Sequence, residues 1–186
     1  MADTFTTLKG QLLLDGGKLH GSCFHRTVVL VCQHDPQGAF GLVLNRASDN
    51  KVGDALTADL PAAVKELPLW LGGPVQPTAL SFLHADAFLP DANVLPNLNL
   101  GHSLDDLQEV GDSFSPTQQL KVFAGYAGWS PGQLDQEMKR HAWLTHPATV
   151  DLVFRADPAT LWKTILTRKG WQYRLLAEGP EDLAWN

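Results

Sequence analysis

The sequence predicts a single α/β domain in which helices flank one mixed, bulged β-sheet. Three observations lead to this prediction. The chain has 186 residues, a length at which one domain buries roughly 70% of its unfolded surface. Short apolar runs typical of strands cluster in the first half, whereas helix and strand patterns alternate in the second half. No Gly/Ser-rich linker separates the halves, so the domain is expected to span residues 1–186.

The first half begins with the patterns of three strands. Residues 10–14 (GQLLL) form an apolar run that ends at a glycine-punctuated loop. Residues 27–33 form a fully apolar run rich in β-branched side chains, which is typical of a buried strand. After a polar turn, residues 39–45 predict a third strand paired with the second. Gly41 within this strand indicates a bulge or a close approach of another backbone.

The remaining elements follow from capping signals and hydrophobic spacing. We expect a short helix within residues 53–65, strands at 69–71, 79–86 and 93–101, a helix from Ser103, a strand at 120–124, a helix at 131–141, a strand at 148–155 and a final helix beginning near Pro158. Ser103 is followed three residues later by Asp106, an arrangement similar to a capping box. The final helix has an apolar stripe at helical spacing, made of Leu161, Trp162, Ile165 and Leu166.

The stretch GYAGWSPGQ, residues 125–133, is predicted to contain a glycine-rich corner at 125–130, between a strand that ends near residue 124 and a helix that starts at residue 131. Ser130 stands at the N-cap position, a proline follows it, and Gln133 completes a Ser-x-x-Gln capping box. Such corners can bind anions through backbone N–H groups, but this one has no lysine, and two carboxylates close behind it would repel a phosphate. Two interpretations stay open: a tight corner in which Tyr126 and Trp129 pack inward, and a corner that also lines a binding cleft.

The overall charge argues against a nucleic-acid-binding protein. The formal net charge is −6 and the pI is near 5.5, whereas non-specific binding to nucleic acid depends on an excess of Lys and Arg. The best local basic cluster is Arg168, Lys169 and Arg174. No secretory signal pattern is visible at the amino terminus, and no apolar run approaches the ~20 residues that span a bilayer. We therefore expect a protein of the reducing cytoplasm, without contact to a membrane.

Four residues of the zinc-ligand types occur close together, as Cys23, His25, Cys32 and His34. The predicted strand between the two pairs holds them roughly 15 Å apart, because a strand rises about 3.3 Å per residue. Tetrahedral zinc needs all its ligands within about 2.3 Å of one ion, and bridged cysteines have Cα atoms within about 7 Å. We therefore expect neither a metal site nor a disulfide here, and the chain has no dinucleotide or P-loop fingerprint that predicts a cofactor.

Several blocks of the chain resemble the AlgH/YqgE family of bacterial proteins. The similar blocks are FHRTVVLVCQHDPQGAFGLVLNR, LGGPV, FLH and GYAGWSPGQLDQEM followed by AWLTHPA, and together they cover nearly the whole chain. The resemblance implies a cytosolic, single-domain mixed α/β protein with a bulged sheet. Some family members are labelled transcriptional regulators, but no helix-turn-helix pattern is readable in this sequence. Gly17 and Gly21 depart from the family pattern, which commonly has a proline and an acidic residue in that loop.

The sequence favours a binding or regulatory module over an enzyme. Neither His34 beside Asp35 nor His84 with Asp86 is accompanied by a recognisable nucleophile, so we assign no catalytic residue. Glycine-bounded strand exits can instead converge on a cleft for a small anionic or polar ligand or for a peptide of a protein partner. The residues of this predicted cleft are Asn45, Arg46, Gly72, Gly73, His84, Gly125, Tyr126, Gly128, Trp129 and Gln133.

Three alternatives to that hypothesis stay open at this point. In the first, each glycine only serves a turn that requires positive φ. The second is an enzyme acting on a small anionic or nucleotide-like substrate, and the third is a transcriptional regulator. No residue pattern specifies an oligomeric state.

Overall fold

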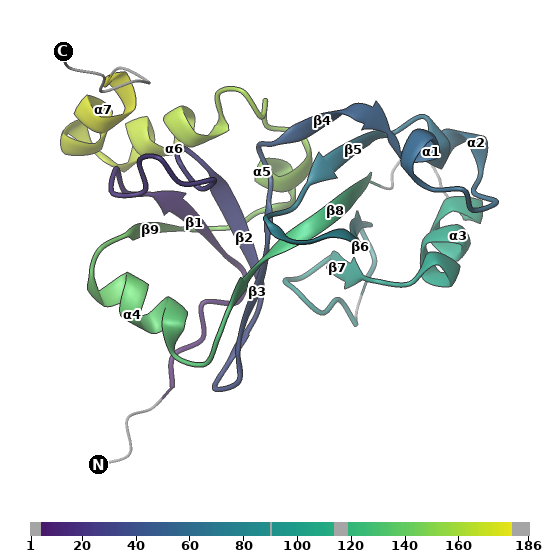
Figure 1. Cartoon of the computed structure of the whole chain (residues 1–186), viewed down its shortest axis with the longest axis horizontal. Helices are drawn as coiled ribbons and strands as arrows, with labels where there is room; N and C mark the ends of the chain where they lie inside the picture. Colours follow the sequence, from purple (N-terminus) through teal and green to yellow (C-terminus); the bar gives the residue numbers. More distant parts are fainter. Residues whose placement is uncertain (1–4, 90, 114–118, 180–186) are drawn as a thin grey trace.

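Figure 1 shows a computed structural model of the chain, which describes residues 5–89, 91–113 and 119–179. The strands are β1 (Gln11–Asp15), β2 (Val28–Asp35), β3 (Gly38–Val43), β4 (Ala47–Lys51), β5 (Pro68–Leu71), β6 (Val75–Ala85), β7 (Leu98–Gly101), β8 (Gln119–Trp129) and β9 (Trp143–Pro147). The helices are α1 (Val52–Ala55), α2 (Ala62–Lys65), α3 (Leu104–Asp112), α4 (Gln133–Lys139), α5 (Val150–Phe154), α6 (Leu161–Lys169) and α7 (Trp171–Glu178).

The described strands form one mixed sheet, which confirms the predicted fold class. Their order is β4-β5-β8-β3-β2-β1-β9, and β6 and β7 branch from β8. The pairing of β5 with β8 is parallel, whereas the other pairings between named strands in the described part are antiparallel. Strand β8 joins the two parts of the sheet, because its first half pairs with β5 and β6 and its last residues pair with β3.

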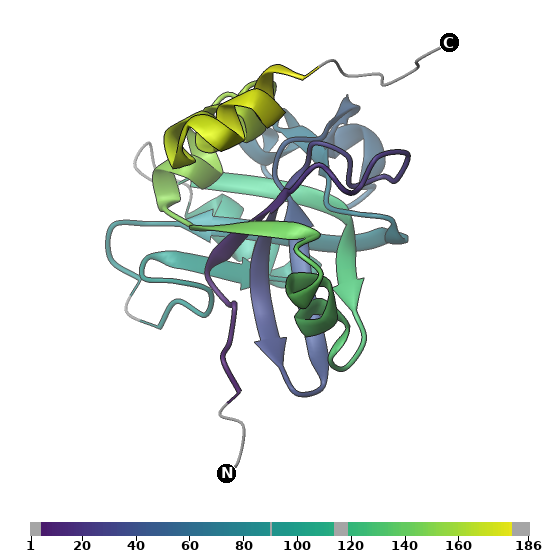
Figure 2. The same ribbon diagram turned by 90° about the vertical axis from the view of Figure 1, so that its left-hand side faces the viewer.

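Helices cover both faces of this sheet. One apolar cluster lies beneath α5, α6 and α7, a second beneath α4, and a third beneath α1, α2 and α3. Strand β1 lies between the first two clusters: Leu12 and Leu14 point into one and Leu13 into the other, because successive side chains of a strand face opposite sides. In Figures 1 and 2 the α6–α7 pair lies on one side of the molecule and α4 on the opposite side.

Gly41 is predicted to mark a bulge or a close approach of another backbone; the close approach is at Gly41, and the extra residue of the bulge is Cys32 on the neighbouring strand β2. The register between β2 and β3 shifts between Val31 and Gln33, opposite Gly41 and Phe40. A Cβ atom added to Gly41 would lie 2.8 Å from the carbonyl oxygen of Leu30. The glycine therefore allows a closer approach of two backbones than any other residue would permit.

The predicted corner at residues 125–130 is wrong, because β8 continues through Trp129. The helix that follows starts at Gln133, after Gly132 in a left-handed conformation, and not at the proline. Half of the predicted capping box is present, since the backbone N–H of Ser130 donates to Oε1 of Gln133. The backbone of residues 126–129 is extended because two neighbouring strands, β3 and β6, pair with it.

Two further predictions near the end of the chain need correction. The strand predicted at 148–155 is helix α5, capped by Thr149, whose hydroxyl accepts the N–H of Leu152. The strand lies earlier, at β9, where it pairs with β1. The single helix expected after Pro158 is divided by Gly170 into α6 and α7. The expected helix within 53–65 is likewise two single-turn helices, α1 and α2.

Candidate functional site

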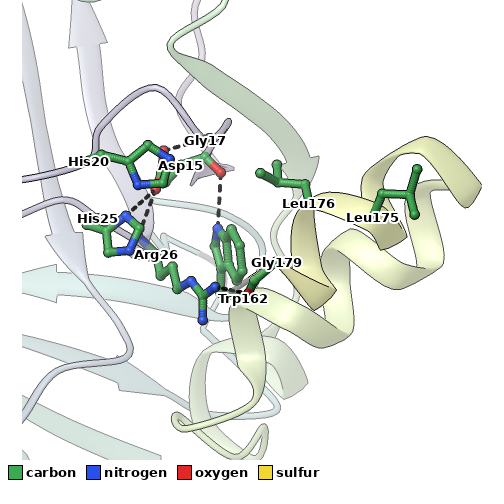
Figure 3. Close-up of a pocket in the computed structure, with 9 residues that line it drawn as sticks. All are labelled: Asp15, Gly17, His20, His25, Arg26, Trp162, Leu175, Leu176 and Gly179. Atoms are coloured by element: carbon green, nitrogen blue, oxygen red, sulfur yellow. Dashed lines mark hydrogen bonds and ion pairs between the residues drawn. The ribbon is translucent and has the colours of Figure 1, made fainter. Parts of the chain in front are cut away.

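Two adjoining cavities lie where α6 and α7 meet the loop between β1 and β2, and we call them together the α6–α7 cavity. The inner part has a volume of about 140 Å³ and the outer part about 510 Å³. Figure 3 shows the inner lining, made of Asp15, Gly17, His20, His25, Arg26, Trp162, Leu175, Leu176 and Gly179. The outer lining shares His25, Arg26, Trp162 and Gly179 and adds Asn45, Arg46, Pro158, Ala159, Lys163, Ala177 and Glu178.

Asp15 organises the loop that forms one wall. Its side chain is fully buried at the end of β1. One carboxylate oxygen accepts the backbone N–H groups of Gly17 and Leu19, at 2.8 and 3.3 Å, and the other accepts that of Arg26 at 2.8 Å. A buried carboxylate is tolerated when several donors satisfy it. The loop therefore folds around this side chain.

Trp162 forms the floor that both cavities share. Its indole N–H donates to the backbone oxygen of Asp15 at 3.1 Å, which ties α6 to β1. The Arg26 guanidinium lies 5.2 Å from the centre of the Trp162 ring and donates to the backbone oxygen of Gly179 at the end of α7 (Figure 3). This stacking is a cation–π contact. Arg26 itself has a left-handed backbone, φ 53°, which these contacts hold in place.

Asn45 and Arg46, at the exit from β3, also line the outer cavity. The side chain of Asn45 accepts the N–H of Val28 and donates to the carbonyl of Arg26, both at 2.9 Å. The Arg46 guanidinium donates to the backbone oxygen of His25 at 2.8 Å. The β3 exit is therefore tied to the same loop that Asp15 organises.

The outer cavity carries an excess of positive charge. Arg26, Arg46 and Lys163 line it together with one carboxylate, that of Glu178. In the described part of the chain, neither Arg46 nor Lys163 forms an ion pair. A concave surface of one sign of charge concentrates ions of the opposite sign. This concentration of cations is notable in a chain whose formal net charge is −6.

His25 lies between the two cavities and beside the buried carboxylate. Its Nδ1 is 3.4 Å from Asp15 Oδ2, and its ring centre is 4.7 Å from that of His20. Both ring nitrogens are buried without a hydrogen-bond partner in the described structure, although about a quarter of the side chain is exposed. The exposed part of the ring is therefore its carbon edge.

Of the residues predicted from the sequence to form a cleft, Asn45 and Arg46 line the α6–α7 cavity. Gly72, Gly73 and Gly125 also lie close together, but their backbones pack against one another and leave no cleft between them. A Cβ atom on Gly73 would lie 2.2 Å from the carbonyl carbon of Tyr126, and one on Gly72 would lie 2.3 Å from the oxygen of Gly125. These glycines allow two chain segments to pack in contact, and they line neither part of the cavity.

Tyr126, Gly128, Trp129 and Gln133 lie elsewhere on β8 and α4. The ring of Tyr126 stacks on that of Phe40, with centres 4.8 Å apart, and Gly128 pairs with Phe40 in the sheet. The Trp129 indole and the Gln133 amide both donate to the carboxylate of Glu137. The sequence interpretation in which Trp129 packs inward matches its exposed fraction of 7%.

His84 lies near the far end of β6, where it pairs with Leu120 and Asn99. Burial lowers the pKa of its imidazole, and the nearby charge of Asp86 opposes that effect. The structure thus brings Asn45 together with Arg46, the three glycines together with Tyr126, and Trp129 together with Gln133. His84 lies apart from these groups.

The cavity residues that the sequence analysis did not select as a site include Arg26, Trp162 and Lys163. Trp162 was expected only as part of an apolar stripe, and it is buried as that stripe predicts. An indole N–H within the stripe was a usable signal, because a buried Trp needs a hydrogen-bond acceptor. The acceptor, the backbone of Asp15, is 147 positions away in the sequence, so no local pattern could identify it.

Strand β2 separates the cysteine and histidine pairs that resemble zinc ligands. Cys23 is exposed and Cys32 is buried, and both are free thiols. His34 instead anchors the amino-terminal segment, since its Nδ1 accepts the N–H of Leu8. Within the described residues no cluster of three or more His, Cys, Asp or Glu side chains could hold a metal ion. None of the helices in those residues is both long and apolar enough to cross a bilayer.

Known proteins that are similar to this chain match it along nearly its whole length and point to the same family. The family model described as AlgH-like (DUF179) matches residues 12–174. A UPF0301 protein of Chlorobium luteolum is 36% identical over 177 residues, which are 92% of this chain and 91% of that protein. A UPF0301 protein of Chlamydia pneumoniae is 31% identical over 180 residues, with 96% and 95% covered.

Two solved structures share the fold. The solution structure of AlgH from Pseudomonas aeruginosa has a TM-score of 0.72 and 28% identity, and covers 95% of this chain and 97% of its own. The crystal structure of protein DIP2367 from Corynebacterium diphtheriae has a TM-score of 0.77 at 23% identity, with 95% of each chain covered. The overall fold is therefore shared with a protein of Pseudomonas aeruginosa and one of Corynebacterium diphtheriae.

Proposed function

The chain belongs to the AlgH-like family, and we propose that this member is a binding module whose α6–α7 cavity holds a small anionic ligand. The observation that carries the proposal is the lining of the outer cavity, where Arg46 and Lys163 have no carboxylate partner in the described structure. Guanidinium and ammonium groups form charge-assisted hydrogen bonds with phosphate and carboxylate oxygens. The predicted location, a reducing cytoplasm, is part of the same proposal and is supported by the exposed free thiol of Cys23.

The size and walls of the cavity limit the class of ligand. A volume of about 510 Å³ suits a metabolite-sized molecule better than a polymer. Trp162 is 5% exposed, and its ring is in contact with Arg26, so it offers little free face for stacking with a nucleobase. Small carboxylates and phosphorylated metabolites fit this description better than nucleotides do.

The enzyme alternative has less support from the geometry. A general base must come within about 3 Å of the proton that it removes. Both ring nitrogens of His25, the imidazole nearest to the cationic wall, are buried. Binding without chemical conversion is therefore the simpler proposal.

Isothermal titration with inorganic phosphate, citrate and ADP at low salt tests the proposal. At least one of these probes should bind, and Arg46→Ala and Lys163→Ala should each weaken that binding roughly tenfold, because each removes a charge-assisted contact worth about 1.5 kcal/mol. Matched controls are Arg140→Ala, directly after α4, and Lys9→Ala, which remove exposed cations outside the cavity. Binding that is equally sensitive to all four substitutions would contradict a localised site, and so would a complete lack of binding.

A further inference from the structure

We propose that anion binding in the α6–α7 cavity is coupled to the uptake of one proton by His25. The inference rests on the proposed function and adds a regulatory property to the same site: the affinity for the anion increases as pH falls. It starts from the position of His25, whose ring lies between a buried carboxylate on one side and the cationic cavity on the other.

The groups that face His25 divide by their effect on its protonated form. Asp15, with Oδ2 at 3.4 Å from Nδ1, favours the imidazolium. Arg26 and Arg46 oppose it, since one follows His25 in the chain and the other donates to its backbone oxygen. Across the cavity, Lys163 also opposes it and Glu178 favours it, while His20 lies in ring contact at 4.7 Å. In the cavity without an anion, cations on one side therefore counteract the carboxylate on the other.

A bound anion changes this balance. It neutralises the field of Arg46 and Lys163, so that the attraction of Asp15 for an imidazolium is no longer opposed. The hydrogen-bonding state of the ring agrees with such a role. Neither ring nitrogen has a hydrogen-bond partner in the described structure. A protonated Nδ1 would become a donor directed at Oδ2 of Asp15, which is already within ion-pair distance.

The sign of the effect follows from linkage. If the complex binds one more proton than the free protein, the affinity for the anion must rise as pH falls, because the two binding equilibria couple reciprocally. Imidazoles ordinarily titrate near pH 6.5, within the range from 8 to 5.5. Ordinary arginine and lysine side chains keep their charge over this range, so cations of that kind add no pH dependence to anion binding there.

Titration with sulfate separates this inference from the proposed function, because sulfate does not change its charge between pH 8 and 5.5. We expect the affinity of the wild-type protein for sulfate to rise about tenfold from pH 8 to pH 5.5. In His25→Gln, the ratio of the affinity at pH 5.5 to that at pH 8 should fall to about one. The control His141→Gln, an exposed histidine outside the cavity lining, should keep the wild-type ratio. Sulfate binding with the same affinity at both pH values would overturn the proton coupling and leave the anion site intact.

Two other results have equally distinct meanings. Complete absence of sulfate binding at both pH values would contradict the proposed anion site itself. A tenfold ratio that persists in His25→Gln would assign the proton to another group and overturn the role of His25. Because this substitution could disturb the loop, NMR titration of the wild-type histidine rings is the second measurement. Sulfate should shift the midpoint of the His25 ring upward in pH, and an unchanged midpoint would refute the coupling.

Discussion

At the scale of single residues, buried charged groups in this protein are held by different kinds of partner. Asp15 is satisfied by three backbone N–H groups. Lys121 on β8 is 8% exposed, and its ammonium nitrogen lies 3.8 Å from the centre of the Trp70 ring, a cation–π contact. Burial lowers the pKa of Lys121 to about 8. The ring therefore compensates only part of the cost of removing the ammonium group from water.

This lowered pKa makes a prediction about stability and pH. Between about pH 8 and pH 10.5 the unfolded chain carries more protons on Lys121 than the folded protein does, so this residue should make the free energy of unfolding rise with pH. The expected contribution between pH 7 and pH 10 is roughly 2 kcal/mol. Urea denaturation of the wild type and of Lys121→Met at both pH values measures it.

Other groups titrate in this range, so the predicted quantity is the difference between the two proteins. The gain from pH 7 to pH 10 should be smaller in Lys121→Met than in the wild type. Lys9→Met, a substitution of an exposed lysine, should behave as the wild type does. An identical pH dependence in all three proteins would show that the ammonium group of Lys121 is well solvated.

At the scale of elements, strands with buried faces were the most predictable part of the fold. The sequence predicts β1, β2 and β3 because each is a short run of buried apolar side chains, although β1 also pairs with the distant β9 and β3 with the distant β8. The sequence predicts a strand at residues 148–155 because β-branched and apolar side chains are frequent there, yet the Thr149 cap starts helix α5. The sequence predicts that the strand at 120–124 ends there, because the glycines and aromatic residues that follow are typical of a turn. In the structure β8 continues to Trp129, since β3 and β6 pair with these residues.

The candidate site was predictable in part for the same reason. Asn45 and Arg46 follow a recognisable strand, and they do line the cavity. The rest of the lining comes from the loop after β1 and from α6 and α7, elements far apart in the chain. Their meeting depends on the hydrogen bond between Trp162 and Asp15, which leaves no local pattern.

Helix α7 gives a prediction at the same scale, through its contact with the loop after β1. Gly17 has φ +83°, and a Cβ atom there would lie 2.5 Å from Cδ1 of Leu176 on α7. Gly17→Ala should therefore combine backbone strain of about 1 kcal/mol with displacement of the helix. Hydrogen exchange should be faster in the amides of α7 than in the wild type.

Gly21 provides a matched control for this substitution. It lies in the same loop with φ +75°, but a Cβ atom there would meet nothing within 4 Å. Gly21→Ala should show the backbone cost alone and leave the exchange of α7 unchanged. Equal effects of the two substitutions would mean that Leu176 moves away without cost to the helix.

At the scale of the whole molecule, the two parts of the sheet are joined where β8 passes the segment Gly72–Gly73. Gly125 has φ +69°, and a Cβ atom there would lie 2.5 Å from the carbonyl oxygen of Gly73, a backbone atom that cannot rotate away. Gly125→Ala should lower the free energy of unfolding by roughly 3 kcal/mol, the sum of left-handed strain and overpacking. Thermal and urea denaturation measure the loss.

The control at this scale is Gly132→Ala. Gly132 has φ +70° but open space around the position of a Cβ atom, so its substitution should cost only about 1 kcal/mol. The gap between the two variants is the part of the cost that comes from the contact with Gly73. If both variants lost the same stability, the two parts of the sheet would be less tightly joined than the structure indicates.

The position of β1 between β2 and β9 has a consequence for how the chain folds as it leaves the ribosome. β1 lies near the beginning of the chain, yet one of its two neighbours in the sheet is β9, which starts at Trp143. Until roughly three quarters of the polypeptide has been synthesised, β1 can pair with β2 but has no strand partner along its other edge. Pairing across such a distance is slow to nucleate, so the nascent protein is expected to remain dependent on chaperone protection until late in translation.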